Sequence, residues 1–145
     1  SYQDLAGPLV PEFSALTAIT SLQLHTNALT GTIPPQLSTL VSKPGFGLIL
    51  NHNLLTGTIP RQLSTIRMTR LYLHKNRLIG SIPIQFSNLK TTYNVFFAIS
   101  ENADICGTWA YYLHAQDTNG TALGSACSSQ RLQTVALMAF RDRLT

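Results

Sequence analysis

A pattern of leucine, glycine, asparagine and proline recurs along most of this 145-residue chain. A Leu-x-Gly step starts at Leu5, Leu29, Leu55 and Leu78, so successive steps lie 24, 26 and 23 residues apart. Two apolar residues precede each following asparagine by five and three positions, and an Ile-Pro pair follows each of the last three glycines. Several markers that keep phase at this period are typical of a solenoid, in which each coil packs only against its neighbours.

The apolar pairs predict one short strand in each repeat. Because side chains alternate along a strand, a pair such as Leu22 and Leu24 turns inward, and successive strands pair in parallel. An inward asparagine after the strand can bond backbone groups that the turn leaves unpaired. The sequence therefore predicts a stacked ladder of Asn27, Asn53, Asn76 and Asn102.

Glycine, proline and the later leucines shape the return of each coil. Glycine permits positive φ or close backbone approach, whereas proline fixes φ and removes a donor. Leu37 and Leu40 recur at helical spacing, which predicts a helical turn on the convex side. The connection from Val41 to Gly47 is two residues longer than its counterpart one repeat earlier, and we expect a bulged convex loop there.

Residues 29–40, Leu-Thr-Gly-Thr-Ile-Pro-Pro-Gln-Leu-Ser-Thr-Leu, resemble the plant-type leucine-rich repeat. Its consensus runs L-x-x-L-x-L-x-x-N-x-L-x-G-x-I-P-x-x-L-x-x-L, and the resemblance covers about residues 3–105. It implies an α/β fold: a right-handed leucine-rich-repeat solenoid over residues 1–105, with a parallel concave β-sheet, about four repeats, the first of them partial, and then a C-terminal cap. Similar proteins are the polygalacturonase-inhibiting proteins and receptor-like ectodomains.

Residues 102–107, Asn-Ala-Asp-Ile-Cys-Gly, are similar to the opening of that family's C-terminal cap. The resemblance implies that Cys106 pairs with Cys127 in a disulfide-closed cap over residues 106–145, with an amphipathic helix near residues 131–144. A disulfide favours an oxidising compartment, and two free thiols in the cytosol are the alternative. The sequon at Asn119 lies between the cysteines and is expected to carry a glycan.

Two departures from the family pattern concern the chain ends. The family's cysteine-bearing N-terminal cap is absent, so we expect the first coil to expose an apolar end. The last residues resemble the helix that normally opens such ectodomains, and we interpret the chain as a fragment of a longer protein.

The outward residues of the predicted sheet form the candidate binding surface. Alternation places His25, Asn51, His74 and Ser100 in one column, and Gln23, Ile49, Tyr72 and Ala98 in the next. Another column holds Ser21, Gly47, Arg70 and Phe96. Tyr72 with Arg70, His74 and Lys75 is the best cluster, because aromatic and arginine side chains dominate interface energetics. A sheet face that is merely solvated is the competing interpretation. The predicted contact residues are Gln23, His25, Ile49, Asn51, Arg70, Tyr72, His74, Lys75, Ala98 and Ser100.

Other chemistries find little support in the sequence. No motif for a hydrolase, a metalloprotease or a phosphate-binding loop is present, so we expect neither an enzyme nor a cofactor. His25 and His74 are expected about 9 to 10 Å apart, which is too far for one metal ion. Lys and Arg number 10 against 6 Asp and Glu, and they are scattered, which argues against nucleic-acid binding. No apolar run approaches the length of a membrane span.

The sequence therefore predicts a non-catalytic recognition module, extracellular or at the cell surface, that binds a protein or an acidic glycan through its concave face. The alternative is a structural repeat subunit or fragment docked in a larger assembly, where a neighbouring chain covers the N-terminal coil. A more remote alternative is ice binding through a hydroxyl column of Thr32, Thr58 and Ser81. Only three rungs support that column, and Ser81 departs from its threonine pattern.

Overall fold

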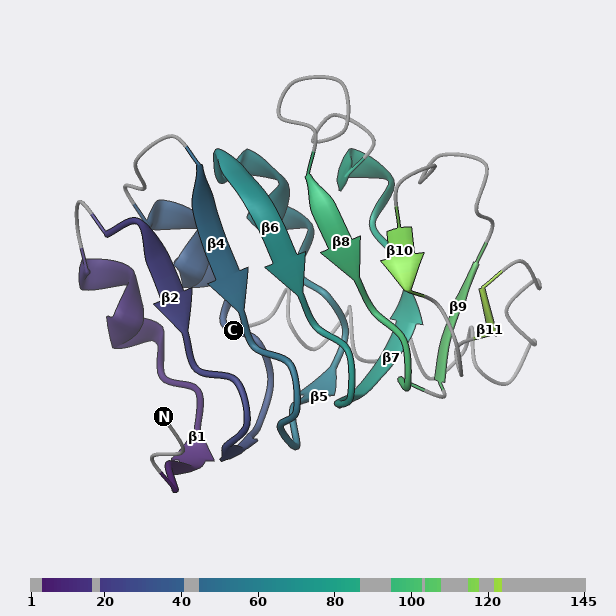
Figure 1. Ribbon diagram of the computed structural model, residues 1–145, viewed down its shortest axis with the longest axis horizontal. Coiled ribbons are helices and arrows are strands. Elements are labelled where there is room, and N and C mark those ends of the chain that lie inside the picture. Colours follow the sequence, from purple (N-terminus) through teal and green to yellow (C-terminus); the bar gives the residue numbers. More distant parts are fainter. Residues whose placement is uncertain are drawn as a thin grey trace, which may run out of the picture.

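The computed structural model describes residues 4–16, 19–40, 45–86, 95–102, 104–107, 115–117 and 122–123. Through these residues the chain winds into stacked coils, and one strand of each coil contributes to a main parallel sheet (Figure 1). The order of strands in this sheet is β10, β8, β6, β4, β2. Their bounds are β2 Ser21–Gln23, β4 Phe46–Ile49, β6 Met68–Tyr72, β8 Phe96–Ala98 and β10 Ala115–Asp117. This arrangement confirms the predicted solenoid with a parallel sheet.

The main sheet keeps repeat-equivalent residues side by side. Leu22 pairs with Leu48, Leu48 with Leu71, and Leu71 with Phe97. All four are buried and belong to one continuous apolar core. The leucine spacing therefore determines both which side chains turn inward and which residues become neighbours.

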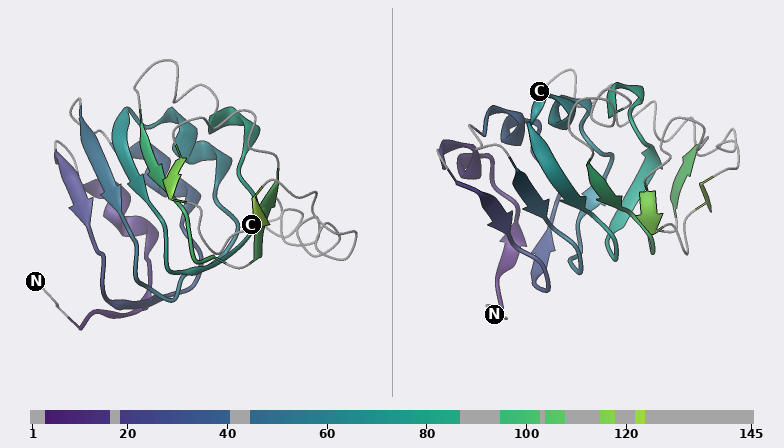
Figure 2. Two further views of the ribbon diagram at one scale, coloured as in Figure 1. Left: turned by 45° about the vertical axis from the view of Figure 1, so that its right-hand side comes forward. Right: turned by 45° about the horizontal axis from the view of Figure 1, so that its top comes forward.

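Short 3-10 helices close the coils on the side away from the main sheet (Figure 2). They are η1 Pro11–Ala15, η2 Pro35–Thr39, η3 Arg61–Thr65 and η4 Ile84–Phe86. Pro34 and Pro60 precede η2 and η3, where a missing N–H costs nothing because the first donors of a helix have no partner. Each of the last three helices directs one side chain into the core, namely Leu37, Leu63 and Phe86. This confirms the predicted helical turns.

A second parallel sheet, which the sequence did not predict, forms from residues around the Leu-x-Gly steps. Its order is β11, β9, β7, β5, and a separate pair joins β1 to β3. The bounds are β1 Ala6–Pro8, β3 Ala28–Thr30, β5 Thr56–Gly57, β7 Arg77–Ser81, β9 Asp104–Gly107 and β11 Ala122–Leu123. Here the coils pair out of step: by repeat position Thr56 corresponds to Ile79, yet it pairs with Arg77.

Four asparagines form a continuous hydrogen-bonded ladder between the two sheets. Asn53 Oδ1 accepts a hydrogen bond from the Leu29 N–H at 3.0 Å, and its Nδ2 donates to the carbonyl oxygens of Leu24 at 2.9 Å and Leu50 at 3.1 Å. Asn76 and Asn102 repeat these contacts one and two coils later, and Asn27 begins the series. Each asparagine thus joins its own coil to the preceding one.

The expected convex bulge does not extend to Gly47, and its residues 41–44 lie outside the described residues. Phe46 and Gly47 belong to strand β4, and Phe46 has no exposed surface. Phe46 pairs with Met68 across an irregularity in register, so part of the extra length is absorbed inside the sheet. The prediction was wrong there because a buried aromatic side chain gains more from the core than from a loop.

The two sheets continue past residue 105, because β9, β10 and β11 add to them. The boundary between solenoid and cap at residues 105 and 106 stays a prediction. Cys127, Asn119 and the helix expected near residues 131–144 lie outside the described residues.

Gly57 lies against Thr32 of the preceding coil, and Gly57→Ala is expected to lower the free energy of unfolding. Its φ of +77° is left-handed, and an added Cβ would lie 2.8 Å from Thr32 Cγ2. The backbone conformation costs about 1 to 2 kcal/mol and the overlap about 1 to 3 kcal/mol more. Urea unfolding measures the sum.

Gly7 provides the matched control, because it holds the same repeat position with φ +102° and nothing within 4 Å of an added Cβ. Gly7→Ala is therefore expected to show the backbone cost alone. Adding Thr32→Ser to Gly57→Ala removes Cγ2 and is expected to recover most of the difference. A double variant no more stable than Gly57→Ala would show that the contact with Thr32 is not responsible.

Candidate functional site

The concave face of the main sheet carries the candidate site. Register aligns Ser21, Gly47, Arg70 and Phe96 in one row across β2, β4, β6 and β8, and Gln23, Ile49, Tyr72 and Ala98 in the next. Backbone hydrogen bonds continue beyond the strands, from Thr26 to Asn51 and from His52 to His74. Predicted residues from four different repeats are thus brought onto one surface. Their role in ligand contact stays a prediction.

The residues of the candidate site differ in how far their side chains are exposed, and two of them are buried. Ile49 is 9% exposed and Ser100 only 1% exposed. The sequence treated Ser100 as the outer end of a column, but β10 adds another strand beyond β8, so this coil lies inside the stack. Ser100 is therefore removed from the candidate contact surface.

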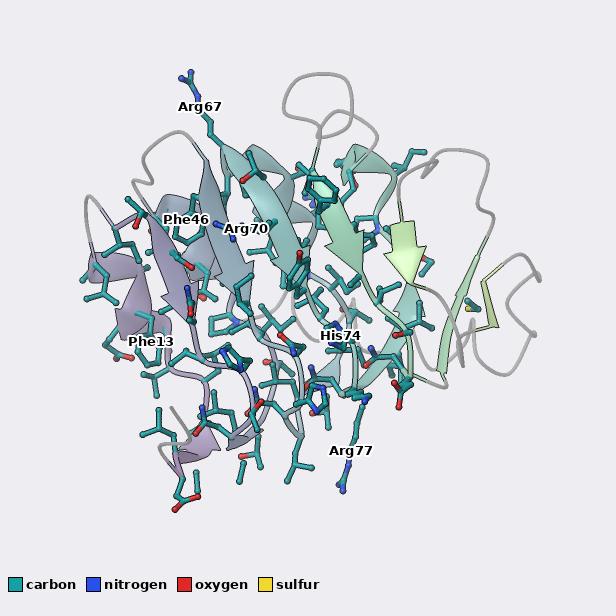
Figure 3. All side chains as sticks on the ribbon, viewed as in Figure 1. Phe13, Phe46, Arg67, Arg70, His74 and Arg77 are labelled. Atoms are coloured by element: carbon teal, nitrogen blue, oxygen red, sulfur yellow. The ribbon has the colours of Figure 1, made fainter. Side chains whose placement is uncertain are left out.

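Aromatic rings gather around His74 in the lower part of this face (Figure 3). The ring centroids of Tyr72 and His74 are 6.1 Å apart, and those of His52 and His74 are 5.5 Å apart in an edge arrangement. The sequence places His52 among the outward residues at the edge of the sheet, one position later in its repeat than His25 or His74, but does not count it among the predicted contact residues. Its neighbour Asn51 has an Oδ1 that is buried without a hydrogen-bond partner among the described residues.

The chain leaves the main sheet through left-handed residues placed just before the ladder asparagines. Thr26, His52, Lys75 and Glu101 have φ between 54° and 56°. Lys75 Nζ lies 3.5 Å from Glu101 Oε1, with both side chains largely exposed. An exposed pair of this kind contributes little stability, but it leaves Lys75 less available to an outside carboxylate.

The exposed Arg70 side chain leans toward the neighbouring strand. Figure 3 shows its guanidinium directed from β6 toward β4. Its Nε is 3.4 Å from where a Cβ on Gly47 would stand, and Ser21 Oγ is also 3.4 Å from that point. Ser21 Oγ donates to the Gly47 carbonyl oxygen at 3.1 Å. The Arg70 side chain thus passes over Gly47, at ordinary van der Waals distance from where a side chain there would begin.

Phe96 is 45% exposed in the row that contains Arg70, although the sequence places it on the candidate surface without counting it among the predicted contact residues. Its signal was present in the alternation of β8, which turns Phe97 inward and Phe96 outward. An exposed aromatic ring beside an arginine is typical of residues that dominate binding interfaces.

The predicted hydroxyl column does not form. Thr32 bridges to Thr56 instead of Thr58, and Thr56 in turn pairs with Arg77. The prediction was wrong because it assumed that the residues after each glycine pair in step, as they do in the main sheet. A charged arginine next to the threonines also interrupts any flat row of hydroxyl groups.

Three further observations concern the first coil, membrane spans and metal sites. The first coil exposes the apolar residues Leu5, Val10 and Leu16, as predicted. Within the described ranges, none of the helices has the length and apolar character needed to cross a bilayer. No group of three or more His, Cys, Asp or Glu side chains suited to a metal ion occurs in that same part of the chain.

Comparisons with known proteins agree with this architecture. The Leucine Rich Repeat family model matches residues 67–89. No relative was found among curated protein sequences. The BIR2 ectodomain from Arabidopsis thaliana matches with a TM-score of 0.71 and 30% identity, over 88% of this chain and 69% of that chain.

Two further solved structures are similar. A chain of the BIR3 and SERK2 complex from Arabidopsis thaliana matches with a TM-score of 0.72 and 28% identity, over 88% of this chain and 71% of that chain. A plant ice-binding protein matches with a TM-score of 0.67 and 31% identity, over 83% of this chain and 39% of that chain. The similarity to polygalacturonase-inhibiting proteins stays a prediction. The repeats, the two sheets and the match to most of BIR2 together show that the chain belongs to the plant-type leucine-rich repeat family.

Proposed function

We propose that this protein is an extracellular recognition module that binds a protein or peptide through the concave face of its main sheet. The observation that carries the proposal is the gathering of Arg70, Tyr72 and Phe96 on one face from two adjacent strands. Arginine and aromatic side chains supply most of the binding energy in protein interfaces.

The family supports a recognition role. Ectodomains of this family are non-enzymatic modules that bind protein or peptide partners. The BIR3 and SERK2 structure is itself a complex of two proteins. A glycan ligand has no comparable support, and the interrupted hydroxyl row gives no reason to propose ice binding.

Replacing Tyr72 tests the proposed face. Peptides selected from a random display library on the immobilised chain are synthesised, and their Kd is measured by fluorescence anisotropy. Tyr72→Ala is expected to weaken binding by at least about tenfold, because truncating a central aromatic residue costs about 2 kcal/mol. Ile84→Ala is the control, since Ile84 is 55% exposed on a convex helix and is expected to leave the Kd unchanged.

Peptides that bind the wild type and Tyr72→Ala equally would contradict the proposal. Sedimentation of the free chain separates it from the structural alternative. A recognition module is expected to be monomeric, whereas a docked subunit is expected to associate through Leu5, Val10 and Leu16 of its first coil.

We also propose that Cys106 and Cys127 form a disulfide, that Asn119 carries a glycan and that the protein acts outside the cell. Cys106 is 1% exposed, its Sγ lies 3.7 Å from the Gly80 carbonyl oxygen, and no cysteine in the described part of the chain is a free thiol. Reduction of native material is expected to add two hydrogens to the intact mass, and deglycosylation to remove one glycan. Alkylation of either cysteine without a reductant would contradict the disulfide.

A further inference from the structure

We infer that Arg70 anchors a carboxylate subsite on the concave face, and that the ligand is an extended peptide with an acidic side chain next to an apolar one. This inference rests on the proposed function of the concave face. It adds the chemical class of the ligand and the residues that would select it.

The first observation is the placement of the Arg70 side chain. It lies over Gly47, with its Nε and Ser21 Oγ both 3.4 Å from the missing Cβ. Gly47 itself is buried under this arrangement. The Ser21 hydroxyl already donates to the Gly47 carbonyl oxygen, so a ligand carboxylate above this residue would accept its hydrogen bonds from the exposed Arg70 guanidinium.

The second observation is the balance of charge on this face. Among the described side chains, Arg70 has neither an ion pair nor a hydrogen bond, and the one ion pair joins Lys75 to Glu101. Glu101 is the only acidic residue among the outward positions of residues 21–26, 47–52, 70–75 and 96–101. The face therefore offers an uncompensated guanidinium, whose forked donors match a carboxylate in a bidentate arrangement.

The third observation is the apolar surface on the other side of Arg70. Phe96 pairs with Arg70 in the register of β6 and β8, and it is 45% exposed. A ligand whose carboxylate meets Arg70 thus places a neighbouring side chain against an aromatic ring. This combination favours a peptide over an acidic glycan, which has no large apolar side chain to offer.

The position within the sheet points to a side chain and not to a free chain end. Strands β4 and β2 continue the sheet on one side of Arg70, and β8 and β10 continue it on the other. A ligand can therefore extend in both directions from its contact with Arg70. An internal aspartate or glutamate fits this placement.

The test uses defined probes and the arginine Nε–H signals of the 15N-labelled chain in NMR titrations. The main probe is N-acetyl-aspartyl-leucine amide, and its neutral isostere is N-acetyl-asparaginyl-leucine amide. N-acetyl-leucyl-glycine with a free carboxylate represents a chain end, and digalacturonate represents an acidic glycan. We expect the aspartyl probe to shift the Arg70 signal at concentrations of about 1 to 50 mM, as a single ion pair in water is weak.

Four arginine variants locate the effect. Arg70→Gln is expected to abolish the shifts of neighbouring backbone signals, and Arg70→Lys to weaken them by about fivefold because the fork is lost while the charge remains. Arg67→Gln and Arg77→Gln are the matched controls, since both arginines are exposed and Figure 3 shows them extending past the upper and lower edges of the molecule, apart from Arg70. These controls are expected to respond like the wild type.

Equal shifts with the aspartyl and asparaginyl probes, or no shift of Arg70 with any probe, would overturn the inference. A response to the free carboxylate alone, or to digalacturonate alone, would overturn the internal acidic peptide as the ligand. The selected peptides separate this failure from failure of the proposed function. Peptides that depend on Tyr72 but bind Arg70→Gln equally well would sink the carboxylate subsite and leave peptide recognition by the concave face standing.

Discussion

Replacing Asn53 by alanine is expected to lower the free energy of unfolding by about 3 to 4 kcal/mol. Asn53 is 6% exposed, and its side chain bonds the Leu29 N–H and the carbonyl oxygens of Leu24 and Leu50. Alanine would leave these groups buried without partners, and each such group costs about 1 to 3 kcal/mol. Urea unfolding followed by circular dichroism measures the change.

Asn51 provides a control of the same residue type in the same coil. Its Oδ1 has no hydrogen-bond partner among the described residues, so Asn51→Ala removes a buried oxygen that gains nothing there. We expect a change within about 1 kcal/mol of zero. If Asn51→Ala proved as damaging as Asn53→Ala, the ladder would not be the source of the stability.

Phe46→Ala is expected to be about as damaging, lowering the free energy of unfolding by about 3 to 5 kcal/mol. Phe46 has no exposed surface and lies at the start of β4, beside Met68 of the next coil. Truncation removes a whole ring from the core and leaves a cavity that the stacked coils on either side can only partly close. Thermal and urea unfolding should both report the loss.

The matched control is Phe96→Ala, because Phe96 is the first residue of β8 but 45% exposed. We expect less than about 1 kcal/mol of destabilisation from it, together with weaker binding of the selected peptides. The two phenylalanines would then divide stability from recognition. A Phe96→Ala variant that unfolds as easily as Phe46→Ala would argue for a structural role of that ring instead.

Much of the fold was predictable because one period controls several features at once. The spacing of Leu22, Leu48 and Leu71 determines the inward column of the main sheet, and the outward rows follow from alternation. The asparagines keep the same phase, so their stacking follows as well. Local pattern was enough wherever equivalent residues pair in step.

The features of the fold and of the site that the sequence did not predict depend on contacts between coils, which no single repeat encodes. The second sheet pairs Thr56 with Arg77, an offset set by how neighbouring coils slide past one another. Ser100 is buried in a coil beyond which residues 115–117 continue the main sheet, and these residues carry no repeat marker. The position of Arg70 over Gly47 required two residues 23 positions apart to be considered together, one of them with no side chain.

The different pairing of the two sheets affects the shape of any longer array built on this pattern. Beyond the irregularity at Phe46, strands β4 and β6 of the main sheet pair equivalent residues, whereas the second sheet shifts by two residues between the coils of Thr56 and Arg77. Because the two sheets of one stack have different register offsets, each coil must rotate relative to the coil before it. In a longer array this rotation would accumulate, so the concave face would twist around the axis along which the coils stack. A straight, rigid partner could contact only a few coils of such a twisted face, whereas a flexible chain could follow the twist over many coils.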